Sequence, residues 1–221
     1  MTKYLLASRS AVLAAAGLLA MAAASGAAYG AGKQGNGPQA TRTIPWPGGD
    51  TLGVSVGSAK VRYTQGPNRG LVATGRKATV DNLVIVNGNV RFARRMLNSG
   101  DLVLVLTAPD VRRFSLAGSN SLSVDRYDQD SLKLSISGSG DADLNGKARM
   151  VDLSISGSGE IDAADLAVAD AKINISGSGE AKVGPTQSAD VRISGSGDVE
   201  LTSSPAKLNS RVSGSGKVTT R

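Results

Sequence analysis

Cysteine and histidine are both absent from the 221 residues of the chain. Their absence excludes disulfide bonds, thiol chemistry and the side chains that usually bind zinc or haem. It also removes the imidazole base of serine hydrolases, so the Gly-x-Ser-x-Gly pattern at residues 53–57 does not indicate a catalytic serine. Aromatic residues make up only 3% of the chain, so the core must be mainly aliphatic.

Long hydrophobic runs are confined to the N-terminus. Residues 11–24 form an apolar segment behind the positive charges of Lys3 and Arg9, and small residues follow at 25–28. This order is typical of a secretory signal peptide, which we assign to residues 1–31; the alternative is an N-terminal membrane anchor. Since no later run reaches the roughly 18 apolar residues of a membrane span, we expect no integral membrane segment in the mature chain. A glycine-rich flexible linker is predicted at residues 32–43.

Acidic residues are scarce in the first half of the mature chain. Residues 31–120 contain 12 basic and 4 acidic side chains, whereas residues 121–221 contain 11 basic and 14 acidic ones. Such asymmetry can mark binding of anionic partners. No nucleic-acid motif and no set of stacking aromatics accompanies the basic residues. We therefore expect them to solvate strand faces and loops, and we expect no nucleic acid as a partner.

Glycine is abundant, with 28 residues, and much of the excess belongs to a repeat. The tetrapeptide Ser-Gly-Ser-Gly occurs five times, with starts 19, 20, 18 and 19 residues apart. The copies occupy residues 137–140, 156–159, 176–179, 194–197 and 213–216, and an altered copy, Ala-Gly-Ser-Asn, occupies 117–120. A fixed period between strand-like segments is the signature of a solenoid, in which each repeat buries its apolar side chains against its neighbours.

The spacing of apolar residues predicts which side chains point inward. Ile173, Ile175, Gly177 and Gly179 lie two residues apart, so the glycines share the inward register and the serines take the outward one. We predict an all-β fold, a right-handed parallel β-helix or solenoid with rungs of about 19 residues. Residues 44–221 form its single domain, with an irregular β part at 44–116 and the repeats at 117–221.

The repeat also resembles a known family. The recurring pattern is Ile-Ser-Gly-Ser-Gly, then Asp or Glu and a hydrophobic residue, preceded by a valine-rich segment that contains Leu-Thr-Ala-Pro-Asp-Val at 106–111. These features are similar to the head GIN domain family, labelled as auto-transporter adhesin head domains, over residues 44–221. The resemblance implies a β-helix-like fold and an exported location. It implies no catalytic or binding residue, because none is established for the family.

One column of acidic residues is chemically distinctive. The residue after each Ser-Gly-Ser-Gly is Asp141, Glu160, Glu180, Asp198 and then Lys217. Stacked one rung apart, the four carboxylates would repel one another, and a hard cation such as calcium would relieve the repulsion. We interpret the column as a solvated face, with a cation ladder as the alternative. We assign no catalytic, cofactor-binding or metal-binding residue and expect no cofactor.

The sequence therefore favours a non-enzymatic, exported β-solenoid that serves as a binding or adhesion-type module of the bacterial cell envelope. Its location would be periplasmic, at the cell surface or extracellular, and its partners would be envelope glycans or envelope proteins. One alternative is a carbohydrate-active β-helix enzyme that uses carboxylates between Asp141 and Asp162. Another is a structural or signalling module for a second envelope protein.

Overall fold

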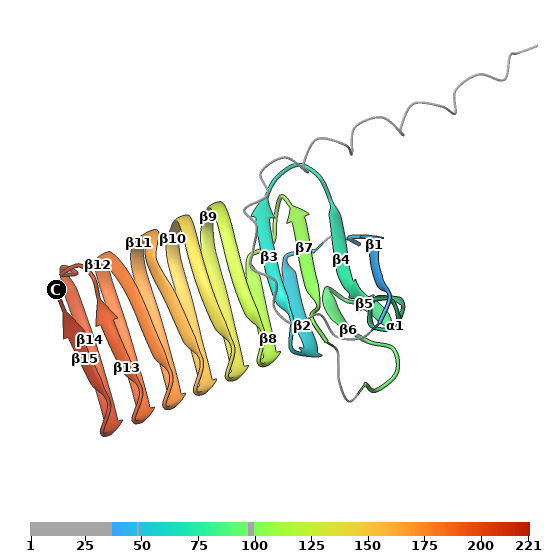
Figure 1. The fold of residues 1–221 in the computed structure, drawn as a ribbon. Helices are drawn as coiled ribbons and strands as arrows, with labels where there is room; N and C mark the ends of the chain where they lie inside the picture. Colours follow the sequence, from blue (N-terminus) through green and yellow to red (C-terminus); the bar gives the residue numbers. More distant parts are fainter. Residues whose placement is uncertain (1–36, 48, 97–99) are drawn as a thin grey trace, which may run out of the picture. The chain divides into compact units, whose positions relative to one another are not determined.

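The computed structural model describes residues 37–47, 49–96 and 100–221, so the predicted signal peptide and the first part of the linker lie outside the described residues. Nearly all of the described secondary structure is β-strand (Figure 1). The first part contains β1 (Gln39–Pro45), β2 (Thr51–Gly57), β3 (Lys60–Gln65), β4 (Gly70–Arg76), α1 (Lys77–Asp81), β5 (Leu83–Val86), β6 (Asn89–Phe92), β7 (Val103–Ala108) and β8 (Arg113–Gly118). The repeats contain β9 (Ser121–Gly138), β10 (Asp141–Gly157), β11 (Glu160–Gly177), β12 (Glu180–Gly195), β13 (Asp198–Leu201), β14 (Lys207–Gly214) and β15 (Lys217–Thr220).

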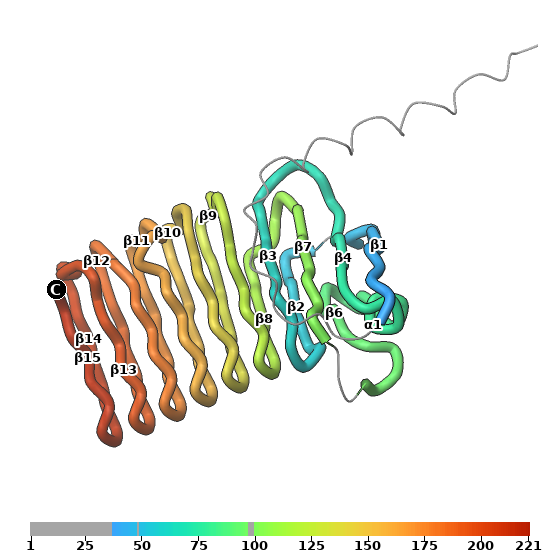
Figure 2. The backbone as a smooth tube through the Cα atoms, in the orientation of Figure 1, coloured from blue at the N-terminus to red at the C-terminus, as the bar shows by residue number. Residues whose placement is uncertain are grey.

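The repeats form a parallel stack in which equivalent residues pair. β9, β10, β11 and β12 pair in that order. β13 pairs with the first half of β12 and β14 with its second half, β15 pairs with β13, and β14 and β15 form the last rung. Each rung has a trailing leg before one Ser-Gly-Ser-Gly turn and a leading leg after that turn, and Figure 2 shows the turns as narrow loops. Register shifts, such as the one between Ala163 and Val168, mark the bend between the legs. The predicted β-solenoid is therefore confirmed.

The stack begins earlier than the sequence repeat indicates. β3 pairs in parallel with the leading leg of β9, and β8 pairs with its trailing leg. β2 pairs with β8 and places Gly57 in register with Gly118, so residues 57–59 form one more turn of the stack. This turn reads Gly-Ser-Ala, and residues 66–112 separate β3 from β8. Both facts hide the turn from a search for the tetrapeptide.

The structure differs from the predicted linker at residues 39–43. These residues belong to β1, which pairs antiparallel with β4 from Gln39 opposite Arg76 to Pro45 opposite Gly70. β4 in turn pairs antiparallel with β7, so β1 and β4 add two antiparallel strands to the parallel stack. The polar composition of residues 39–43 suggested a tether, but the edge of β4 supplies hydrogen bonds that composition does not reveal.

Each Ser-Gly-Ser-Gly turn places glycine where a Cβ atom would meet the previous rung. Gly177 has φ +122°, and a Cβ there would overlap the carbonyl oxygen of Gly157. Gly179 is buried, and a Cβ there would come within 2.6 Å of the Ile155 Cγ2 atom. Ser176 and Ser178 are exposed. The predicted inward position is therefore confirmed for Gly179 and the outward one for both serines. Gly177 is half-buried and faces the backbone of the preceding turn, so close stacking of backbones requires glycine there.

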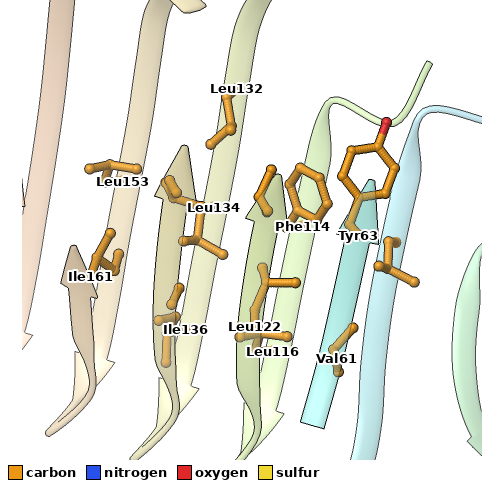
Figure 3. Close-up of a cluster of buried hydrophobic side chains, with 14 of the residues drawn as sticks. Val61, Tyr63, Phe114, Leu116, Leu122, Leu132, Leu134, Ile136, Leu153 and Ile161 are labelled. Carbon is orange, nitrogen blue, oxygen red and sulfur yellow. The ribbon is translucent and has the colours of Figure 1, made fainter. Parts of the chain in front are cut away.

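The core between the legs is mainly aliphatic, as the composition predicts. Leu134, Leu153 and their equivalents point between the two legs and are almost fully buried (Figure 3). Aromatic rings gather where the first part meets the repeats: Tyr63 and Phe114 make an edge contact with centroids 5.2 Å apart, and Phe114 lies 6.4 Å from Tyr127. Burial raises the pKa of Tyr63 to about 12, so its hydroxyl stays protonated and donates to the Ala108 carbonyl at 2.8 Å.

The last rung departs from the others in its inward side chains. Ser210 is in register with Val191, and Thr220 is in register with Leu201. Leu208 and Val212 remain 44% and 43% exposed. No helix within the described residues is both long and apolar enough to cross a membrane.

The turn geometry predicts unequal costs for two neighbouring substitutions. Gly177→Val places a branched side chain at positive φ against the Gly157 backbone, so we expect a loss of about 3 kcal/mol of stability. Ser178→Val changes an exposed side chain, and we expect an effect within about 0.5 kcal/mol. Thermal melting followed by circular dichroism compares the two variants. Equal losses would mean that the glycine is not held by backbone stacking.

Candidate functional site

Two outer faces of the repeats carry in-register columns of polar side chains. The acidic face is the outer side of the leading legs and includes Asp141, Glu160, Glu180 and Asp198 at equivalent positions. The serine face is the outer side of the trailing legs and includes the serine column that begins at Ser137. Both faces arise because strand residues alternate between the core and the outside, while parallel pairing aligns each outward residue with its equivalent in the next rung.

The structure brings the four predicted acidic residues into one column of exposed side chains. Ser121 precedes the column and Lys217 follows it. The Lys217 backbone N–H donates to the carboxylate of Asp198 at 2.8 Å. Within the described part of the chain, no three acidic side chains are grouped so that they could hold a metal ion. The arrangement favours a solvated column, which remains a prediction.

A second column lies two residues further along the leading legs; it begins with two aspartates and continues with Lys182 and Glu200. Asp143 is in register with Asp162, and both border a hollow of about 300 Å³ together with Asp125 and Asp165. Partial burial raises the pKa of the Asp143 carboxyl above its ordinary value of 3.8, and repulsion from Asp162, Asp141 and Asp125 raises it further. The leading legs around Asp143 therefore present a surface that disfavours additional negative charge.

A larger hollow, of about 830 Å³, lies at the bends between the legs. Three basic residues around it have partners at the same bends. The Nε atom of Arg112 donates to Gln129 at 2.8 Å, and Lys147 lies 3.0 Å from the carboxylate of Asp128. Arg149 lies 3.8 Å from the carboxylate of Asp170. Because each of these three basic side chains already has a polar or acidic partner at the bends, we assign the bends a structural role.

The serine face contains three columns that run across the rungs. The first alternates in charge and comprises Lys133, Asp152, Lys172, Asp190 and Asn209. The second comprises Ser135, Ser154, Asn174, Arg192 and Arg211, and the third comprises Ser137, Ser156, Ser176, Ser194 and Ser213. Lys133 donates to Asp152 at 3.1 Å, so opposite charges in the first column meet between rungs.

A groove of about 400 Å³ follows the second and third columns over four rungs. Four residues of the second column and four of the third column form its walls. The residue between the two columns in each strand also lines it: Ile155, Ile175, Ile193 and Val212. Four rungs span about 14 Å at the usual strand spacing. Hydroxyl and amide groups both donate and accept hydrogen bonds, and serine loses little conformational entropy when it is immobilised. The groove therefore presents a row of short hydrogen-bonding groups across the strands, beside a mostly apolar exposed surface.

Sequence reasoning singled out the acidic column and placed the serines of the tetrapeptides in the outward register. It did not identify Arg192 or Arg211 as part of a groove. The repeat alignment contains the signal, because Ser154, Asn174, Arg192 and Arg211 each lie two residues before the first serine of a tetrapeptide. The groove itself depends on the stacking of the rungs.

The acidic column predicts a small response to calcium. If Asp141, Glu160, Glu180 and Asp198 are only solvated, millimolar calcium should shift the melting temperature by less than about 2 °C. Replacing the four residues with Asn or Gln should be mildly stabilising, because repulsion between neighbouring rungs is lost. A rise of several degrees with calcium that disappears in the quadruple variant would identify a cation ladder instead.

The raised pKa of Asp143 predicts a pH-dependent effect on stability. The folded protein holds the Asp143 proton more tightly than the unfolded chain does, so ionisation of this group lowers stability as the pH rises above 3.8. Asp143→Asn should therefore melt at a higher temperature than the unmodified protein at pH 7, and the difference should vanish below pH 3.8. Asp152→Asn is the control: it loses the contact with Lys133 and should not raise the melting temperature. The same gain in both variants would contradict the assignment.

Solved structures from other bacteria share the fold of this chain. A "putative adhesin" from Bacteroides fragilis is 20% identical, with a TM-score of 0.67, and the alignment covers 86% of this chain and 100% of that one. A "putative adhesin" from Parabacteroides distasonis is 14% identical, with a TM-score of 0.56 and coverages of 85% and 99%. A "putative lipid binding protein" from the same species is 21% identical, with a TM-score of 0.52 and coverages of 85% and 98%.

Because all three sequence identities are low, these likenesses show a shared fold and nothing about a shared function. None of the curated proteins is significantly similar to the chain in sequence. A family model, however, matches residues 52–205, which extend from β2 through the repeats to the bend before β14. The resemblance seen in the repeat is thereby confirmed, and the chain belongs to the family described as "Putative auto-transporter adhesin, head GIN domain".

Proposed function

We propose that this protein is a non-enzymatic, exported adhesion-type module of the bacterial cell envelope that binds linear glycans along the groove of its serine face. The family supports an adhesion-type role, and the relatives described above are named as adhesins or as a lipid-binding protein rather than as enzymes. The predicted signal peptide at residues 1–31 supports export to the periplasm, the cell surface or the medium.

The groove of the serine face is the observation that carries the proposal. It is shallow and continuous over four rungs, and its walls repeat the same hydroxyl position in Ser156, Ser176, Ser194 and Ser213. A linear glycan presents hydroxyl groups at regular intervals along an extended chain, so a line of short donors and acceptors matches it chemically. The repetition of rungs also supports binding rather than catalysis, because catalysis requires a specialised constellation of groups in one place.

The test is a binding screen of residues 32–221 against immobilised envelope glycans and neutral linear polysaccharides, with and without calcium. The variant Ser156→Phe/Ser176→Phe fills the groove with two aromatic rings and should abolish binding. Ser158→Phe/Ser178→Phe is the matched control, because it adds the same rings to exposed serines at the turn tips, outside the groove.

Binding that is lost in the groove variant and retained in the turn variant would support the proposal. Both variants should keep the melting temperature of the unmodified protein within a few degrees, because all four serines are exposed. Failure of the unmodified protein to bind any glycan, or equal binding by both variants, would overturn it.

A further inference from the structure

We propose that the glycan held in the serine-face groove is a linear polyuronate, a polysaccharide whose sugar units carry carboxylates. This inference rests on the proposed function, and it names the chemical class of the ligand at the same site. Two arginines at one end of the groove carry the argument. A neutral polymer would use the serines alone, whereas a polyuronate would also use the guanidinium groups.

Arg192 and Arg211 stand at equivalent positions of neighbouring rungs. They are in register with each other and continue the column of Ser154 and Asn174, so the column changes from neutral to positive as it approaches the last rung. Both arginines line the groove beside the serine column. Adjacent rungs lie about 4.8 Å apart, so the two guanidinium groups present a local cluster of positive charge to a chain in the groove.

The two arginines differ in how far their charge is already neutralised. Arg192 donates to the carboxylate of Asp190 at 3.0 Å. In the last rung Asn209 takes the place of Asp190, and Arg211 forms no ion pair with any residue that the structure describes. Arg211 is also exposed. A planar guanidinium binds a carboxylate through two parallel hydrogen bonds, so Arg211 is the stronger anchor and Arg192 supports it.

The charges elsewhere on the repeats direct a polyanion to this groove. The acidic face carries Asp141, Glu160, Glu180 and Asp198 in one column, and the raised pKa of Asp143 reflects the same crowding of negative charge. A polyuronate would be repelled there. On the serine face the carboxylates of the alternating column have cationic neighbours, because Asp152 contacts Lys133 and Asp190 contacts Arg192.

The test compares two polymers that share a backbone. Polygalacturonate carries one carboxylate per sugar, and fully methyl-esterified polygalacturonate lacks these charges. In calcium-free buffer at low salt, residues 32–221 should bind polygalacturonate about tenfold more tightly than the ester, which corresponds to roughly one charge-assisted hydrogen-bonding pair. The preference should weaken as salt is added, because the guanidinium groups are at the surface.

Arg192→Gln/Arg211→Gln should lower the affinity for polygalacturonate and bring the ratio of the two affinities close to one. Lys207→Gln/Lys217→Gln is the matched control: it removes the same charge from the last rung at exposed positions outside the groove, and it should keep the preference. Dextran sulfate is the third polymer. If it binds as tightly as polygalacturonate and ignores the arginine variant, the attraction is non-specific and the inference fails.

Equal binding of the acid and the ester would overturn the inference and leave the proposed function standing. A loss of preference in both double variants would also overturn it, since net charge would then explain the result. If neither polymer binds and the groove-filling Ser156→Phe/Ser176→Phe variant changes nothing for any glycan, the proposed function fails together with the inference.

Discussion

Close stacking of the glycine turns is the constraint on which the rest of the structure depends. The first glycine of a turn has positive φ, and the carbonyl oxygen of the preceding turn occupies the space that a Cβ atom would need. Backbone N–H groups then bridge the rungs: Ser178 donates to Gly157 at 2.9 Å, and Glu180 donates to Gly159 at 3.0 Å. These contacts hold consecutive turns in one register, and the legs on either side of each turn inherit that register.

A common register converts a sequence repeat into columns on the surface. Inward positions must be apolar, because each side chain packs against its equivalents in the neighbouring rungs. Outward positions are free of that requirement, so the same repeat can place carboxylates on the leading legs and hydroxyl, amide and guanidinium groups on the trailing legs. The two faces therefore differ in charge although every rung contributes to both. Specificity for a ligand can change through outward residues alone, with little effect on the fold.

The first part of the chain shows where sequence reasoning reaches its limit. The tetrapeptide revealed the repeats, but Gly57 belongs to the same column of turns and carries no recognisable copy of the motif. Tyr63, Phe114 and Tyr127 meet in one aromatic cluster although they are far apart in the chain. A low aromatic content indicated an aliphatic core and said nothing about where the few rings would gather. Contacts between segments separated by an insertion have no local signal.

The solenoid, the period of its rungs and the outward placement of the serines could all be predicted from the residues alone, because they follow from local alternation and from the spacing of glycine. The column of Asp141, Glu160, Glu180 and Asp198 could be predicted in the same way, since each follows a turn by the same number of residues. The strand β1 in place of part of a linker, and the groove that Arg192 and Arg211 form with the serines, became visible only in the folded chain. The physical reason is that a strand edge and a groove exist only between segments, when separate stretches of backbone lie side by side.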